Sequence, residues 1–389
     1  MNFLINKEIK ILSLSFLFIF LGFSGVQQYV TSFFSEIGII EVGFHSLILT
    51  YLFFTISDPL AGVFVSKYGA KKLMIIGSFF YFVFILSLLA KNNYFIYFTS
   101  ALLGIGASML WTGQNTFLIR ASKEKSYGEN SGFFSFSQSI GAAAGVFFIG
   151  FLIERFLFKT SFLFFSIFPL IGFFLLFSLR DIREKQELNH FRLLKKSIVS
   201  MTALKLALIY FSVQFIYGLA IGIIPIEIKK NFSLSYVGIL SSLFWILPLL
   251  FTYFFGKLSD IKGRKQMIII SYALIMVGLL LLFISENPIF LIAAIVFIAL
   301  SSAIMKPTTF ALVGDVSTGK NLEFITALFW MSQTLGVLIS LFFSQLFQSQ
   351  PKNIYLISIF VIAGSLVILL PFFRLRLEEM KERLSKEIS

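Results

Sequence analysis

The sequence contains no cysteine and only two histidines, His45 and His190. The absence of thiols excludes disulfide bonds, thiolate zinc sites and cysteine nucleophiles. Two histidines in separate segments argue against a histidine-rich metal site. Charged residues make up only 13% of the chain, whereas soluble domains hold about a quarter. This shortage of charge excludes a soluble enzyme, a disordered regulator and a nucleic-acid-binding protein.

The chain is instead rich in apolar residues, which make up 58% of it, with 53 Phe and a mean hydropathy of +0.91. They fall in blocks of about 20, the length that crosses the hydrocarbon core of a bilayer as a helix. The sequence therefore predicts an all-α integral membrane protein with twelve transmembrane helices. These spans are 10–33, 43–66, 73–90, 93–119, 128–154, 161–179, 203–228, 235–257, 266–285, 288–314, 322–349 and 352–373.

Lysine and arginine set the orientation of these spans. With the N-terminus inside the cell, the inner segments hold 25 Lys and Arg and the outer loops hold six. Because basic residues gather in cytoplasmic loops, both termini are predicted to be cytoplasmic, in a multi-pass protein of the cell membrane. The net charge of +13 then reflects these loops and needs no nucleic-acid partner.

The two halves of the sequence repeat each other at a nearly constant offset. Matching segments lie 193 to 195 residues apart, as in Val42-Gly43 and Val237-Gly238, Asn115-Thr-Phe and Thr308-Thr-Phe, and Ser137-Gln138 and Ser332-Gln333. Parallel repeats of six spans are typical of transporters with a site near the bilayer midplane. We predict an N-terminal six-helix bundle over 1–180, a cytoplasmic linker over 181–202, a C-terminal bundle over 203–373 and a cytoplasmic amphipathic tail over 374–389.

Glycine-rich basic loops follow the second span of each half. The second copy, 256–265, reads Gly-Lys-Leu-Ser-Asp-Ile-Lys-Gly-Arg-Lys, and its glycines suit a tight turn between close helices. The pattern resembles the cytoplasmic signature of the major facilitator superfamily, over essentially the whole chain. The resemblance implies two pseudo-twofold-related bundles, rocker-switch alternating access and a cytoplasmic gate. The gate residues would be Gly62, Gly69, Lys71, Gly256, Asp260, Gly263, Arg264 and Lys265. The alternative is a tight basic turn without a gating role.

The sequence departs from the superfamily pattern in three places. Ser66 stands where the first signature copy should carry its acid. Ser100 replaces the arginine typical of proton antiporters, and Gly141–Gly145 lacks the proline that follows in their fifth span. Drug–proton antiport is therefore disfavoured. The segments 22–27 and 104–117 resemble the Unc-ninety-three-like branch, which includes trafficking and channel-regulating proteins.

One lysine lies well inside a predicted span, away from its ends. Lys306, followed by Pro307, stands nine residues before Asp315, about 13 Å from the cytoplasmic end at 1.5 Å per residue. Intramembrane charge is costly and marks functional sites, so Lys306 predicts a site for a carboxylate or phosphate. A structural ion pair is the alternative, and Asp58, beside Pro59, is a conceivable partner. Asp58 is also the candidate for coupling to protons.

Uncharged polar and aromatic side chains inside the spans complete the predicted binding site. Amides in spans also serve helix packing, and the two tryptophans could equally be packing residues. The substrate-binding candidates besides Lys306 are Gln28, Gln114, Asn115, Gln214, Gln333, Trp111 and Trp330.

No nucleophile–base pair, metal cluster or phosphate loop is visible in the sequence, so we expect a non-enzyme without cofactor or metal. The leading interpretation is a monomeric secondary transporter for a small, anionic or amphipathic organic solute, with a proton or another ion as coupling partner. The alternatives are a non-transporting membrane adaptor of the same fold and an exporter of hydrophobic drugs.

Overall fold

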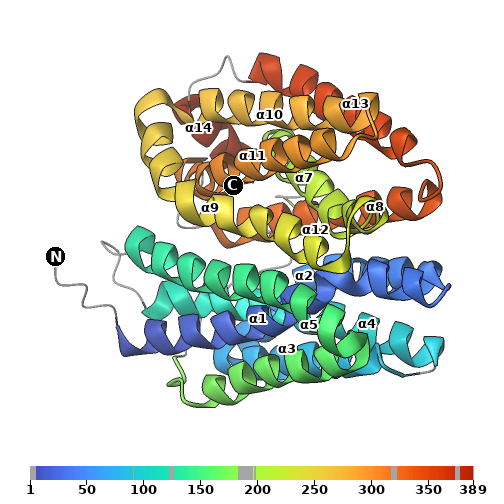
Figure 1. The fold of residues 1–389 in the computed structure, drawn as a ribbon. Coiled ribbons are helices and arrows are strands. Elements are labelled where there is room, and N and C mark those ends of the chain that lie inside the picture. Colours follow the sequence, from blue (N-terminus) through green and yellow to red (C-terminus); the bar gives the residue numbers. More distant parts are fainter. Residues whose placement is uncertain are drawn as a thin grey trace. The chain divides into compact units, whose positions relative to one another are not determined.

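The computed structural model describes residues 6–90, 92–121, 127–182, 196, 199–316, 322–372 and 377–388, and the regular structure in them is helical (Figure 1). The chain divides into two compact units, one of residues 1–187 with 225–245 and the other of 188–224 with 246–389. Residues 183–195, most of the predicted linker, lie outside the described residues.

The first unit contains the helices of the first half and a segment of the second. Its helices are α1 (Lys7–Glu36), α2 (Ile40–Tyr68), α3 (Ala70–Ser87), α4 (Asn93–Ala121), α5 (Tyr127–Phe177), α8 (Ile224–Asn231) and the beginning of α9 (Leu234–Lys262). The second unit contains α7 (Met201–Ile221), the rest of α9, α10 (Arg264–Ile284), α11 (Pro288–Val316), α12 (Leu322–Leu346), α13 (Pro351–Phe372) and α14 (Leu377–Ile388).

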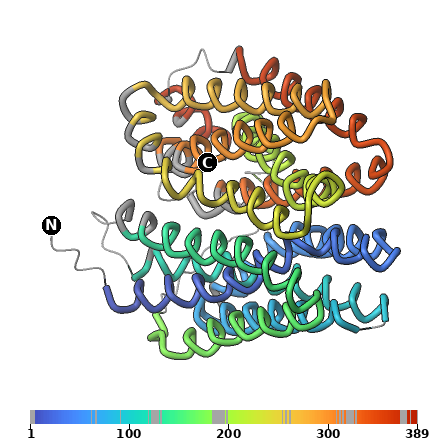
Figure 2. The backbone as a smooth tube through the Cα atoms, in the orientation of Figure 1, coloured from blue at the N-terminus to red at the C-terminus, as the bar shows by residue number. Residues whose placement is uncertain are grey.

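Eleven of the described helical segments are long and apolar enough to cross a membrane. One of them, α5, has 51 residues, about 76 Å of helix and enough for two crossings. It is interrupted at Leu157, where φ is 62° and ψ is 169°, and the backbone turns back on itself there (Figure 2). Counting α5 twice gives 11 + 1 = 12 spans. The predicted all-α fold with twelve transmembrane helices is confirmed.

The outer surface of these helices is apolar, as expected for a protein surrounded by lipid. Large side chains such as Phe148, Phe174 and Phe360 are 58%, 61% and 67% exposed. In water such a surface would be unfavourable, whereas the hydrocarbon core of a bilayer accepts it. The protein is an integral, multi-pass membrane protein.

The sequence repeat is visible in the helix boundaries. The helices α1, α2 and α3 begin at residues 7, 40 and 70, and α7, α9 and α10 begin exactly 194 residues later, at 201, 234 and 264. Gly69 and Gly263 join the second and third helix of each repeat with φ of 91° and 89°. Only glycine adopts this conformation without strain. We call the end of each unit that carries such a turn its signature end, and the other its opposite end.

Close packing of α1 on α5 depends on two glycines one turn apart. A Cβ added at Gly141 would overlap the carbonyl of Leu17, and one added at Gly145 would overlap the carbonyl of Leu21. Small residues that allow such an approach are a common basis of helix association in membranes. Gly141 and Gly145 therefore serve close helix packing.

Replacing Gly145 by Val should therefore destabilise the protein by about 3 kcal/mol or more, because the obstructing atom belongs to backbone that cannot rotate away. The measurement is the melting temperature in detergent. The matched control is Gly364→Val in α13, where a Cβ would meet nothing within 4 Å. Equal melting temperatures for the two variants would contradict this account of the α1–α5 contact.

Candidate functional site

The second unit brings together several of the predicted binding residues. Gln214 of α7 donates from Nε2 to Oε1 of Gln333 on α12, at 3.1 Å. One turn earlier on α7, the hydroxyl of Tyr210 donates to the carbonyl of Thr309 on α11, at 2.6 Å. These two hydrogen bonds tie α7 to both α12 and α11.

Lys306 lies on α11 at the level of the amide pair. Because α7 and α11 are an odd and an even span of their repeat, they cross the bilayer in opposite directions. Starting from the Tyr210–Thr309 bond, four residues forward on α7 reach Gln214 and three residues back on α11 reach Lys306. At a rise of 1.5 Å per residue, Gln214 and Lys306 therefore differ by roughly 1.5 Å in their position along the helix axes. Half-buried Lys306 and the two amides therefore form a polar layer within the second unit.

This polar layer, Lys306 with Gln214 and Gln333, has the chemistry of an anion site. An ammonium group offers three donors, and charge-assisted hydrogen bonds to carboxylate or phosphate are among the strongest that proteins make. Pro307, next in the chain, cannot donate a backbone hydrogen bond to the preceding turn. Trp330 is half-buried on α12, one turn before Gln333.

In the first unit polar side chains link the helices in pairs. Gln27 of α1 donates to the hydroxyl of Tyr51 on α2, at 3.2 Å. Tyr81 of α3 is hydrogen-bonded to Trp111 of α4. Trp111 also packs on Phe20 at 5.2 Å between ring centroids. Its surroundings are therefore those of a packing residue that also carries a hydrogen bond.

Two buried acceptors in the first unit lack a donor. Asp58 is 5% exposed and Gln114 is 1% exposed. The Oδ2 atom of Asp58 and the Oε1 atom of Gln114 have no hydrogen-bond partner among the described residues. Burying an ionised carboxylate without compensation costs far more free energy than burying the protonated form. Gln28 is buried at 3% exposure, and Asn115 is half-buried.

The two signature loops make different contacts. In the second copy, Arg264 donates from Nε to Asp315 of α11 at 3.0 Å and from Nη1 to Ser259 at 2.5 Å. The first copy has Ala70 in place of Arg264, and residues 120–122, Arg-Ala-Ser, offer no carboxylate in place of Asp315. The backbone of Gly62, Gly256 and Asp260 is helical, but the side chain of Asp260 lies outside the described part.

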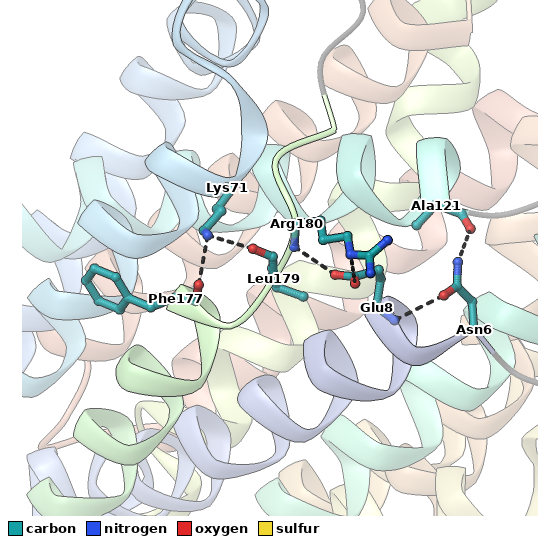
Figure 3. A network of polar contacts seen from close by, with 7 residues as sticks. All are labelled: Asn6, Glu8, Lys71, Ala121, Phe177, Leu179 and Arg180. Carbon is teal, nitrogen blue, oxygen red and sulfur yellow. Dashed lines mark hydrogen bonds and ion pairs between the residues drawn. The ribbon is translucent and has the colours of Figure 1, made fainter.

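The first copy instead binds backbone carbonyls (Figure 3). Lys71 donates to the carbonyls of Phe177 and Leu179 at 2.8 and 2.6 Å, where α5 ends. A cation is favourable at a helix C-terminus. Glu8 accepts from the backbone N–H of Arg180 at 2.8 Å. The signature end of the first unit is thus closed by lysine–carbonyl and carboxylate–amide bonds, a contact that the sequence did not predict.

At the opposite end of the first unit, residues 225–245 pack on α1 and α5, and we call this contact the seam. Tyr29 donates to the carbonyl of Leu234 at 2.6 Å, and Glu154 accepts from the N–H of Ser235 at 3.0 Å. Lys229 pairs with Glu36 at 2.7 Å. Backbones approach so closely that a Cβ at Gly238 would lie 2.6 Å from the carbonyl oxygen of Val146. The described contacts of the seam are thus hydrogen bonds, an ion pair and close backbone packing between segments of the two repeats.

Several of these polar contacts depend on tyrosines that the sequence analysis did not select. Tyr29, Tyr51, Tyr81 and Tyr210 each lie inside a span and make the contacts above. Tyrosine in membrane proteins gathers at the two interfaces, so its position in the middle of a span was the available signal.

Comparison with known proteins agrees with this architecture. The profile of the Major Facilitator Superfamily matches residues 12–205 and 206–388. The chain belongs to the Major Facilitator Superfamily. Two solved structures share its fold: a POT family transporter in complex with 5-aminolevulinic acid, with a TM-score of 0.76, and one in complex with a thioalcohol-conjugated peptide, with a TM-score of 0.75. Each of these two structures is 12% identical in sequence to this chain, and each alignment covers 96% of both chains.

Sequence relatives confirm the predicted resemblance to the Unc-ninety-three-like branch. UNC93-like protein 3 of Arabidopsis thaliana is 30% identical over 113 residues, and UNC93-like protein MFSD11 of Xenopus laevis is 30% identical over 130 residues. These matches span 29% and 33% of this chain but only 23% and 29% of the relatives. An uncharacterized MFS-type transporter of Methanocaldococcus jannaschii is 27% identical over 308 residues, 73% of this chain and 76% of that one.

Proposed function

We propose that the protein is a secondary transporter that moves a small organic anion across the membrane by alternating access. The observation that carries this proposal is the polar layer of Lys306, Gln214 and Gln333. A cation at the level of two amides within a span marks a functional site, and its three donors suit a carboxylate or a phosphate. The fold supports transport as the general function, and one solved transporter of this fold holds an acid, 5-aminolevulinic acid. The fold gives no support to an enzyme.

Alternating access is supported by the construction of the seam. Its segment begins at Pro225 and ends at Trp245, three residues before Pro248 inside α9. Proline breaks a helical hydrogen bond and permits a bend. The seam combines close backbone packing at Gly238 with an ion pair and hydrogen bonds, and each of these polar contacts is individually weak. In this proposal the seam is a gate that closes the opposite end and opens once per cycle.

We further propose that Asp58 takes up the coupling proton. It is buried, and its Oδ2 atom has no hydrogen-bond partner among the described residues. Protonation would remove the cost of an uncompensated carboxylate in that place. A pH gradient that neither drives transport nor responds to it would remove this part of the proposal.

The orientation follows from the same reasoning as in the sequence. We propose that the signature ends and both termini face the cytoplasm, since 25 Lys and Arg lie on that side and six on the other. In the same proposal the protein is a monomer of the cell membrane, and the bundles 1–180 and 203–373 are its two halves. The gate residues of the signature loops keep their predicted role in this proposal.

A ligand screen by thermal shift in detergent tests the proposal. The panel contains small carboxylates, organic phosphates, sugars, amines and hydrophobic drugs. A ligand at a hundredfold Kd stabilises the protein by about 2.7 kcal/mol, which raises the melting temperature measurably. We expect carboxylates or phosphates to stabilise it. Stabilisation by drugs alone would favour the exporter, and no stabilisation by any class would favour the adaptor.

A further inference from the structure

The C-terminal helix α14 is docked on its own unit. The sequence predicts an amphipathic tail with Leu377, Met380 and Leu384 on one side. Met380 and Leu384 are 2% and 0% exposed, because α14 packs against α7 and α11. The apolar face of this helix is therefore covered by protein, whereas Glu378 and Glu382 remain exposed.

The end of α14 caps the beginning of α7. Glu387 accepts hydrogen bonds from the hydroxyl of Thr202 at 2.7 Å, from the backbone N–H of Thr202 at 3.2 Å, and from the hydroxyl of Ser200. Ser200 is itself the N-cap of α7, with its oxygen 3.1 Å from the N–H of Ala203. A carboxylate at a helix N-terminus satisfies free N–H groups and complements the helix dipole. Here the carboxylate comes from a residue 185 positions away in the chain.

The other end of α14 lies near the signature loop. Glu379 interacts electrostatically with Lys265, the second residue of α10. Its neighbour Arg264 holds Asp315, near the end of α11. The tail helix and the signature loop thus meet at the beginning of α10, where Lys265 adjoins Arg264 and its bond to α11.

These contacts converge on one half of α11. Pro307 removes a hydrogen bond of that helix directly after Lys306, so residues 308–316 can move as a separate half-helix. The Tyr210–Thr309 bond and the Arg264–Asp315 pair hold that half-helix, and α14 packs on α11 and interacts with Lys265 beside Arg264. We propose that α14 is a clamp that holds residues 308–316 of α11 in place, and that its release lets this half-helix move about Lys306. This inference rests on the proposed function, because it takes Lys306 to belong to the binding site that the clamp controls.

Hydrogen–deuterium exchange of the full-length protein in detergent tests the clamp. The variants are Glu387→Gln and a deletion of residues 377–389, and the control is Glu382→Gln on the exposed face of the same helix. We expect peptides within 308–316 to exchange at least roughly tenfold faster in the deletion and in Glu387→Gln, since the opening of a local unit sets exchange. Peptides within 288–302 should be unchanged, and Glu382→Gln should match the wild type.

The deletion removes the whole of α14, so its result tests the proposal even if the single substitution has little effect. Unchanged exchange of 308–316 without α14 would overturn the proposal. Faster exchange spread evenly through the second unit would overturn it too, because it would mean general unfolding. The measurement needs no substrate, so its failure is distinguishable from a failure of the proposed transport.

Acid should release the clamp. Partial burial of Glu387 favours its neutral form, but hydrogen bonds from Ser200 and Thr202 and the charge of Arg383 outweigh this and hold the pKa of Glu387 below its ordinary value. The stabilisation is therefore fully present above the ordinary glutamate pKa of about 4.3 and is lost as the pH falls through the lowered value. We expect the wild type to melt above Glu387→Gln at pH 7 and the difference to vanish once the pH has fallen below the lowered pKa of Glu387. A difference that persists in acid would show that the carboxylate is not the docking group.

Discussion

Lys306→Met is expected to weaken binding of the stabilising anion by roughly 10- to 150-fold, because a hydrogen bond to a charged group contributes about 1.5–3 kcal/mol. The same substitution should leave the melting temperature of the ligand-free protein unchanged or raise it, because it removes a charge from within a span. The two effects together distinguish the two roles predicted for Lys306. If Lys306 binds the anion, the substitution lowers only the affinity for the ligand. If Lys306 forms a structural ion pair, the substitution lowers the stability of the protein.

Lys352→Met is the matched control for this prediction. Lys352 pairs with Glu286 at 3.1 Å and is 46% exposed, so its loss should change neither affinity nor stability by much. Lys306→Arg keeps the charge and should retain part of the affinity. A ligand-free Lys306→Met protein that melts well below the wild type, with ligand affinity intact, would assign Lys306 to a structural pair.

Cross-linking the seam is expected to stop transport. Because the chain has no cysteine, the pair Glu36→Cys and Lys229→Cys can be joined by a short bifunctional methanethiosulfonate without side reactions at other thiols. The native side chains are in contact at 2.7 Å and are 48% and 24% exposed, so the reagent can reach both. If the seam opens once per cycle, transport should fall at least roughly tenfold on cross-linking and recover after reduction.

The control pair for this experiment is Glu286→Cys with Lys352→Cys. These residues form the same kind of ion pair, at 3.1 Å, but both belong to the second repeat, whereas Glu36 and Lys229 belong to different repeats. Cross-linking them should leave transport unaffected. Equal inhibition by both cross-links would point to damage by the reagent, and no inhibition at the seam would mean that the seam does not open.

The sequence predicted most of the fold because lipid imposes simple rules on it. Spans of about 20 apolar residues are forced into helices, and the offset between Gly69 and Gly263 revealed a repeat that the helix boundaries reproduce. The superfamily assignment depended on the second signature loop. The position of Lys306 was also predictable, since a charge inside a span is conspicuous.

Contacts between distant segments could not be predicted. Lys71 was predicted to be a gate residue, but its hydrogen bonds to the carbonyls at the end of α5 were not predicted. Every residue has a backbone carbonyl, so the sequence does not indicate which one a lysine will bind. The Gln214–Gln333 bond needed the packing of α7 on α12 to be known. The tail was recognised as amphipathic, but amphipathicity does not tell a helix that lies on lipid from one that lies on protein. Glu387 capping α7 was invisible for the same reason.

Counterflow in proteoliposomes tests transport by alternating access most directly. Vesicles are loaded with an excess of the unlabelled anion that stabilises the protein, and the labelled anion is added outside. The account predicts that the labelled anion accumulates transiently inside the vesicles. Accumulation should be strongly reduced in Lys306→Met. The cross-linked seam variant should show no accumulation until the cross-link is reduced. Absence of accumulation with every ligand that binds, in vesicles shown to contain folded protein, would contradict it.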